Sequence, residues 1–336
     1  MRKISFIITS MFFIISCKNE SQKANDFISK VPYNDSVYVL NKKFAVGDVR
    51  RYGVFPNMSI GEHANLLKDK MEVLLDLGER GIKLDFPEGI YDRTFNIDSR
   101  SNVSIKSQGA IFTGPVNIKN SNGISISGVI SSLSQFYTRD SENLNVDVIK
   151  VISDTSKTRN NSRSRGVSIH GGSKDIKINK IIVSDLGSGS DYQFVKAGLT
   201  IHGHNNEPVR VKIDTVIIES SDRHGVYLTG KNVIIKYLEV RKFGTGSGKG
   251  MRPMEGGIEG QQYEFSGLWI KNCHDSRIEK SIIYTSLSKG KYVYNFDIGE
   301  SFRPFELDTL IIRGSNKNLK NKSLSRTGVI VRNISE

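Results

Sequence analysis

The chain has 336 residues, two cysteines and a formal net charge of +13 at pH 7. This charge favours anionic partners, although lysine and arginine that only solvate the outside of a strand-rich chain would give the same balance. With so few cysteines, a disulfide framework is excluded once one of them has another role.

The N-terminal segment, residues 1–17, reads as a removable export signal. Two basic residues precede an apolar run from Ile4 to Ile15, which is too short to span a bilayer, and Ser16 and Cys17 follow. A small residue before the first cysteine resembles the lipobox of bacterial lipoproteins, in which Cys17 becomes the lipidated first residue. The alternative is an ordinary secretory signal. We expect an exported lipoprotein of the cell envelope, in the outer membrane and facing the periplasm or the cell surface.

Removal of the signal has two consequences for the mature chain. If Cys17 carries lipid, Cys273 has no intramolecular partner and is predicted to be a small wall residue. Loss of Arg2 and Lys3 lowers the formal charge from +13 to +11 (13 − 2). Residues 18–45 then form a polar tether between the lipid and the domain. We expect contact with the membrane only through the lipid.

Residues 46–95 are predicted to form an N-terminal cap that contains one helix. The helical stretch ends at Gly78, and a glycine at this place is a common helix terminator. A helix whose apolar side needs cover is what an open solenoid end requires. Its apolar residues are Leu66, Leu67, Met71, Leu74, Leu75 and Leu77.

A strand motif of glycine followed by alternating apolar residues occurs four times in the centre of the chain. Its starts are separated by 32, 27 and 42 residues (198 − 166, 225 − 198, 267 − 225), which is the irregular spacing of a solenoid with loops of different length. Alternation with period 2 places the apolar residues inside. The copies are Gly166–His170, Gly198–His202, Gly225–Thr229 and Gly267–Lys271.

A second pattern follows each copy, with apolar residues at positions 0, 2, 5 and 7. It predicts a second strand in each turn, and a coil over residues 96–336. Ile278 and Ile283 fit this pattern only loosely, because Lys280 falls on an expected inward position. The better matches are Ile176, Ile178, Ile181 and Val183; Val211, Ile213, Val216 and Ile218; Val233, Ile235, Leu238 and Val240; Phe305, Leu307, Leu310 and Ile312; and, earlier, Ile124, Ile126 and Val129.

The order of these features resembles the pectate-lyase-like superfamily. Val49–Gly53 matches an opening V-x-x-Y-G, the capping helix follows, Phe86–Tyr91 reads F-P-x-G-x-Y, and Ser101–Phe112 is similar to a first rung. The resemblance covers residues 46–335 and implies an all-β fold, a right-handed parallel β-helix with an N-terminal capping helix. It does not fix the chemistry, because the superfamily includes lyases, hydrolases, epimerases and phage spikes.

Three departures and partial matches bear on that choice. Gly61–Ala64 stands where an acidic Asp-Asp-Thr is often found before the cap helix. His202–His204 is only an echo of the Gly-His-Gly motif of polygalacturonase-like hydrolases, whose paired aspartates are missing. Asp222–His224 is similar to the Asp-x-His element of alginate C5-epimerases but lacks the usual proline.

The outward positions of the repeated strand predict a polar, aromatic and basic face. One ladder contains Ser168, Thr200, Tyr227 and Trp269, and the next contains His170, His202, Thr229 and Lys271. Aromatic rings can carry a sugar ring while cations hold its carboxylates. We therefore expect a groove for an acidic polysaccharide, whose substrate-binding residues are Arg165, His170, His202, Trp269, Lys271 and Arg252.

A β-eliminating lyase needs a cation for the carboxylate, a base for the proton at C5 and an acid for the leaving oxygen. Arg223 and Arg165 are assigned to the carboxylate, His224 or Lys196 to the base, and Tyr227 to the acid. Each assignment has a structural alternative: His170 and His202 as an external polar ladder, Tyr227 and Trp269 as wall packing, and His224 as part of a common rung sequence.

The Gly-rich stretch 244–260 predicts a loop beside this groove. Its Glu255 and Glu259 could hold Ca²⁺ together with Asp222, or could simply be solvated; no other cofactor is expected. The alternatives to a lyase are a glycoside hydrolase, which needs two carboxylates, a uronate C5-epimerase, and a non-catalytic glycan-binding or adhesive β-helix. We expect a monomer and no nucleic-acid partner, since no nucleic-acid motif is present.

Overall fold

The computed structural model describes residues 34–58, 64–153, 166–185, 197–203, 206–245, 265–297, 304–316, 318–323 and 328–335. The chain divides into two units, Met1–Tyr38 and Val39–Glu336. In the first unit the described residues form the short helix η1 (Ser36–Tyr38). Among the described residues, no helix combines the length and the apolar character needed to cross a membrane. The predicted signal, Cys17 and most of the tether lie outside these residues.

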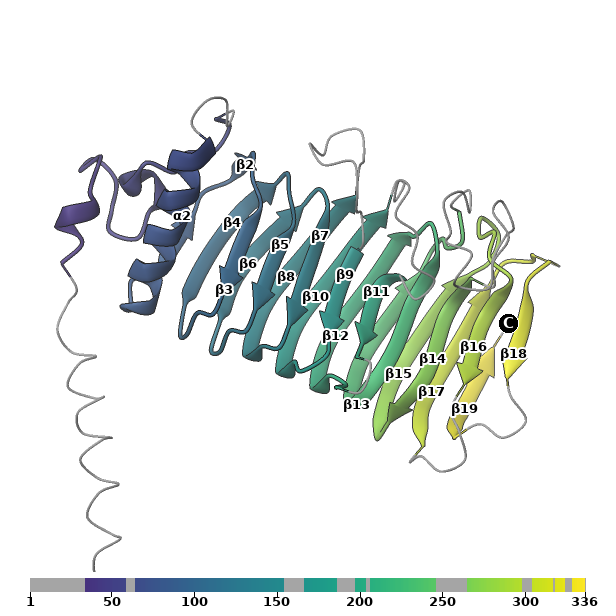
Figure 1. The fold of residues 1–336 in the computed structure, drawn as a ribbon. Coiled ribbons are helices and arrows are strands. Elements are labelled where there is room, and N and C mark those ends of the chain that lie inside the picture. Colours follow the sequence, from purple (N-terminus) through teal and green to yellow (C-terminus); the bar gives the residue numbers. More distant parts are fainter. Residues whose placement is uncertain are drawn as a thin grey trace, which may run out of the picture. The chain divides into compact units, whose positions relative to one another are not determined.

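The second unit is a parallel β-helix, which confirms the predicted all-β solenoid. After η2 (Val49–Tyr52) and α2 (Ala64–Glu79), the described strands pair in parallel and stack in chain order, and α2 lies beside the first strands, at the start of the stack (Figure 1). We call one series the long-strand ladder: β1 (Leu84–Phe86) and β2 (Gly89–Tyr91) on β4 (Ser104–Phe112), then β6 (Ser125–Ser132), β8 (Glu142–Ser153), β10 (Lys174–Asp185), β12 (Val209–Ser220), β13 (His224–Val240), β15 (Ser276–Tyr284), β17 (Phe305–Arg313) and β19 (Val329–Ser335).

The second series, the short-strand ladder, shares β13 with the first. Stacking in the coil begins at Leu84, before the predicted start at residue 96, because β1 and β2 already pair with β4. The members of this ladder are β3 (Phe95–Asp98), β5 (Val116–Lys119), β7 (Gln135–Arg139), β9 (Gly166–His170), β11 (Ala197–His202), β13, β14 (Ser266–His274), β16 (Tyr292–Asp297) and β18 (Lys320–Ser323).

The repeated glycine motif stacks in register, as predicted. Leu199 pairs with Val167 on one side and with Val226 on the other, and Val226 pairs with Leu268. All four side chains are fully buried. The glycine is required by close packing: a Cβ on Gly225 would lie 2.4 Å from the carbonyl oxygen of Gly267 and 2.5 Å from Val240 Cγ1.

The second pattern is also confirmed in register for its three best copies, since Ile178 pairs with Ile213 and Ile213 with Ile235. The expectation for Lys280 is wrong. Lys280 pairs with the outward Tyr237 and is exposed, while Ser281 pairs with the inward Leu238. In β15 the inward positions are Ser276, Ile278, Ser281 and Ile283, so two serines hide the apolar pattern.

Val129 is likewise not an inward residue. Gly128 adopts φ +81° and the register shifts between Ile126 and Val129, so an extra residue is inserted. Ile130, which is buried, takes the inward position and pairs with Ile149. A bulge of this kind displaces every later side chain by one position.

Residues in the left-handed conformation occur in the turn that leads into most of the long strands. Asn102, Asn143, Asp175 and Asn232 all have φ between 53° and 56° and stand just before β4, in β8, in β10 and in β13. Asparagine and aspartate tolerate this conformation better than other residues with a side chain. Arg210, at φ +58°, lies at the equivalent turn in β12 and forms an ion pair of 2.6 Å with Asp175 on the preceding rung.

The helix α2 covers the first strands, as the predicted cap requires. Leu74, Leu75 and Leu77 are buried, whereas nothing is described for the side chains of Leu66 and Leu67. Arg100 fastens the helix to the coil through three carboxylates: its guanidinium lies 2.6 Å from Glu72 and 2.9 Å from Glu79, and also contacts Asp76.

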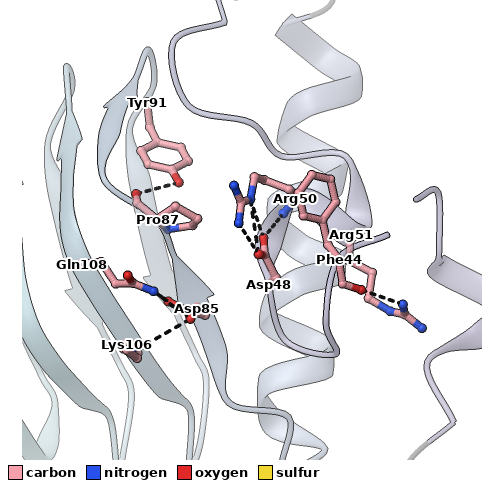
Figure 2. Close-up of polar contacts among 9 residues, drawn as sticks. All are labelled: Phe44, Asp48, Arg50, Arg51, Asp85, Pro87, Tyr91, Lys106 and Gln108. Carbon is pink, nitrogen blue, oxygen red and sulfur yellow. Dashed lines mark hydrogen bonds and ion pairs between the residues drawn. The ribbon is translucent and has the colours of Figure 1, made fainter. Parts of the chain in front are cut away.

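Two polar clusters flank the junction between η2 and the first strands (Figure 2), and the junction itself is joined by the Asp85 N–H, which donates to the Gly47 carbonyl at 2.8 Å. Asp48 accepts a hydrogen bond of 2.9 Å from the Arg50 N–H and pairs with the Arg50 side chain at 2.6 Å. The Arg50 guanidinium lies 4.4 Å from the centre of the Phe44 ring. Asp85 on β1 accepts from Gln108 and pairs with Lys106 at 3.3 Å. These groups satisfy one another, which indicates a structural role.

Replacing Arg100 by alanine should lower the free energy of unfolding by roughly 2 kcal/mol, because three carboxylates lose their shared cation. The matched control is Lys236→Ala, which removes one exposed pair of 2.7 Å with Asp214 and should change the free energy of unfolding little. Urea unfolding followed by circular dichroism measures both. Equal losses of unfolding free energy in the two variants would show that Arg100 does not hold the cap helix on the coil.

Gly225→Ala should lower the free energy of unfolding by more than about 2 kcal/mol, since the new methyl group overlaps the Gly267 carbonyl of the next rung and the Val240 side chain. Gly81→Ala serves as the comparison: this glycine has φ +91° but no atom within 4 Å of the place that a methyl group would take, so only backbone strain of about 1 kcal/mol remains. Thermal unfolding of the two variants gives the order. A milder effect at Gly225 would contradict the close packing described above.

Candidate functional site

The predicted outward ladders exist in the structure. In one column Tyr137 pairs with Ser168, Ser168 with Thr200, Thr200 with Tyr227, and Tyr227 with Trp269. In the neighbouring column Lys119 pairs with Arg139, and His170 pairs with His202. The short-strand ladder therefore carries one polar and aromatic face across successive rungs.

Aromatic and imidazole rings form a continuous chain along this face. The ring centres of Tyr137 and His170 are 5.0 Å apart, and those of His170 and His202 are 5.9 Å apart. Further along, Tyr227 lies 5.5 Å from His202 and 4.5 Å from Trp269. Rings at these separations cover one another's faces and edges.

The expected exposure is wrong for the downstream part of this chain. Tyr227 and Trp269 are only 2% and 6% exposed, and His224 is completely buried. The His224 ring lies 4.9 Å from Trp269 and 5.3 Å from Phe265, so the rings pack on one another instead of presenting flat surfaces to solvent. The wall-packing alternative describes Tyr227 and Trp269 better than a sugar platform.

The contacts of His224 do not suit a general base. The Ser266 N–H donates a hydrogen bond of 3.0 Å to His224 Nδ1, so the neutral ring carries its proton on Nε2. The nitrogen that could accept a proton is then already occupied, and the residue has no exposed surface. Arg223 and Asp222, its predicted neighbours in the site, are also buried.

A smaller set of polar side chains does reach the solvent. Arg139 is exposed, while Lys119, His170, His202 and Lys271 are half-buried; we call these five the basic stripe. Half-buried Tyr137 lies beside it, with Lys119 Nζ 5.8 Å from its ring centre. At the other end Lys271 Nζ lies 5.8 Å from the centre of the Trp269 ring.

Sequence reasoning identified His170, His202 and Lys271 but missed Lys119, Tyr137 and Arg139. Their strands, β5 and β7, lack the glycine that marks the four central copies. The signal that could have found them is weaker: Val116 and Ile118 alternate as in the later strands, and Phe136 and Thr138 are the buried pair of the next rung.

Several predicted residues lie outside the described ranges, namely Arg165, Lys196, Arg252, Glu255, Glu259 and Cys17. Their roles, and the predicted Ca²⁺ site that combines Asp222 with the two glutamates, therefore stay predictions. Within the described ranges, no group of three or more histidine, cysteine, aspartate or glutamate residues could hold a metal ion.

Comparisons with protein-family models, with curated proteins and with solved structures find no match to this chain. The parallel β-helix is thus observed directly in the strand pairing, whereas the resemblance to the pectate-lyase-like superfamily stays a prediction. The function has to be argued from the residues of the face itself.

Cys273 is the wall residue that was predicted. It has no exposed surface, and burial raises the pKa of its thiol to about 12. Because the thiolate is the reactive form, the chain from Lys18 onward should resist iodoacetamide while folded and take up one equivalent after denaturation. Mass spectrometry counts the label, with Cys273→Ala as the blank. Equal labelling rates in the two states would contradict this burial.

Proposed function

We propose that this protein binds an anionic polysaccharide along the basic stripe and cleaves it by β-elimination. The observation that supports this most directly is the stripe, in which cations and imidazoles occupy neighbouring rungs on one face. Parallel strands lie about 4.8 Å apart, a repeat comparable to the length of one sugar unit. A chain with one carboxylate on each sugar can therefore meet one basic group after another.

The charge of the stripe is only partly compensated within the protein. Arg139 pairs with Asp140 at 3.0 Å, but both side chains are exposed, and such surface pairs contribute little energy. A bound carboxylate can replace or share this partner. Arginine binds carboxylates through two parallel N–H groups, which gives direction as well as charge.

The part of the stripe near Tyr137 offers the three groups that β-elimination needs. Lys119 and Arg139 neutralise the substrate carboxylate, which makes the proton at C5 more acidic. His170, whose ring lies 5.0 Å from Tyr137, takes that proton. The electron pair forms the C4–C5 double bond, the C4–O bond breaks, and Tyr137 donates a proton to the leaving oxygen.

This assignment replaces the one centred on His224 because the residues near Tyr137 are accessible. The electrostatic interaction with Tyr137, and with it that with Asp140, raises the pKa of Arg139. The guanidinium therefore stays charged next to the phenol throughout the working pH range. A neutral imidazole near pH 7 suits the role of base.

Two other functions use the same face. A C5-epimerase shares the proton abstraction and returns the proton instead of breaking the chain, so the two enzymes differ in product. A non-catalytic glycan-binding β-helix would use the cations alone, and the burial of His224 is an observation that favours it, because the base predicted from the sequence cannot reach a substrate.

His170→Gln should reduce turnover of a polyuronate by at least about 100-fold while binding changes little, since general acid–base catalysis contributes about that much or more. Turnover is measured as ultraviolet absorbance from unsaturated uronate on alginate, pectate and glycosaminoglycans, and binding by calorimetry. Loss of binding together with turnover would assign His170 to substrate binding instead of catalysis.

Reversing two charges of the stripe, Lys119→Glu with Lys271→Glu, should weaken binding of the same glycan by roughly 10-fold or more and reduce its salt dependence. The matched control is Lys177→Glu with Lys212→Glu, two exposed and neighbouring lysines on the long-strand ladder. Binding without turnover by the unmodified protein would leave the glycan-binding function. An equal loss of affinity in the control variant would show that the glycan responds only to the net charge of the protein.

A further inference from the structure

A second basic surface lies at the cap end of the unit. Unlike the stripe, it also exposes several large apolar side chains. In the segment 39–58, which we call the cap loop, Leu40 is 66% exposed, Val46 61% and Met58 47%. Ile90, 45% exposed, is joined to the loop because its N–H donates to Asn57 Oδ1 at 3.0 Å. Four of the nine large apolar side chains that are exposed in the described residues therefore belong to this loop and the strand beside it, and such a concentration marks an interaction site.

These side chains are held outward by an ordered backbone. The N–H groups of Leu40 and Asn41 both donate to the Arg51 carbonyl at 3.0 Å, and the Arg51 guanidinium donates to the Phe44 carbonyl at 2.9 Å. Within the turn the Lys43 N–H donates to Asn41 Oδ1 at 3.0 Å. The loop is therefore fixed on η2, and its apolar side chains cannot simply fold under it.

The charge of the cap loop is positive. It contains Lys42, Lys43, Arg50 and Arg51 against Asp48, a net charge of +3 (4 − 1). The carboxylate of Asp48 is paired with Arg50 at 2.6 Å. Lys42 and Lys43, both exposed, stand between Leu40 and Val46 in the chain.

We propose that the cap loop docks on the surface of a bilayer that contains anionic phospholipid. Leu40, Val46 and Met58 enter the boundary between headgroups and acyl chains, while Lys42 and Lys43 contact the lipid phosphates. A bilayer fits better than an acidic glycan because a glycan offers charge but no apolar depth for four exposed aliphatic side chains.

The position of the loop in the chain supports the same partner. The tether predicted for residues 18–45 overlaps the start of the cap loop at Val39, the first residue of the second unit, and predicted lipidation at Cys17 is 22 residues before Val39 (39 − 17). Lipid and cap loop would then act on one surface, which combines two membrane signals. The stripe begins on β5, beyond the first rungs, and stays accessible to substrate.

The test uses the chain from Lys18 onward, without lipid, in flotation with vesicles of phosphatidylcholine alone or mixed with phosphatidylglycerol. The chain should float with the mixed vesicles. Leu40→Ser with Val46→Ser, and separately Lys42→Glu with Lys43→Glu, should each lower the partition coefficient roughly 10-fold or more. Leu287→Ser, at another exposed aliphatic residue, and the stripe pair Lys119→Glu with Lys271→Glu should change it little.

Two results would overturn the proposal: no flotation with mixed vesicles, or equal losses for the cap-loop and stripe variants, which would mean unspecific attraction of a basic protein. Leu40→Trp keeps an apolar side chain and guards against misfolding of the serine variants. Its added fluorescence should shift to the blue with mixed vesicles, whereas that of Leu287→Trp should not. An unshifted Leu40→Trp spectrum also counts against docking.

Discussion

The register between successive parallel strands is the constraint on which the rest of this structure depends. Once Val226 pairs with Leu199 and Leu268, the alternation of strand side chains decides for all remaining residues of the three strands whether they point into the coil or outward. The apolar columns are buried only by the rungs above and below. A shift of one residue would place Tyr227 inside and Val226 outside, and both the core and the outer face would be lost.

The same register explains why the central repeat could be read from the sequence and why other parts could not. In β9, β11, β13 and β14, a glycine followed by alternating aliphatic residues shows the two-residue period of a strand directly in the sequence. In β15 the serines at 276 and 281 occupy inward positions, and a polar residue such as serine is not predicted to lie in the core. Ser276 is satisfied there because its hydroxyl accepts from the Val233 N–H and donates to the His274 carbonyl. The bulge at Gly128 depends on local backbone conformation, which an apolar pattern does not report.

The candidate site was predictable in position but not in exposure. Strand alternation places Tyr227 and Trp269 on the outer face, and the structure agrees, yet pointing away from the coil interior does not mean facing water. Two large rings on adjacent rungs come within 4.5 Å and shield each other, and His224 adds a third. Arg139 and Tyr137 become visible only when β7 is aligned on β9, since no local motif marks them. Whether an outward side chain is buried depends on the side chains of the neighbouring rungs, and the sequence of one strand does not contain this information.

The two basic surfaces show how one solenoid can separate two kinds of recognition. Both carry lysine and arginine, so the net charge of the chain cannot tell them apart. The stripe places lysine, arginine and two imidazoles on four successive rungs beside a half-buried phenol, which suits a periodic, hydrophilic polyanion. The cap loop places its cations between exposed aliphatic side chains, which suits a surface that offers both phosphate and hydrocarbon. Because salt screens charge but leaves apolar burial intact, polyanion binding at the stripe should weaken steeply with salt while contact at the cap loop should weaken less.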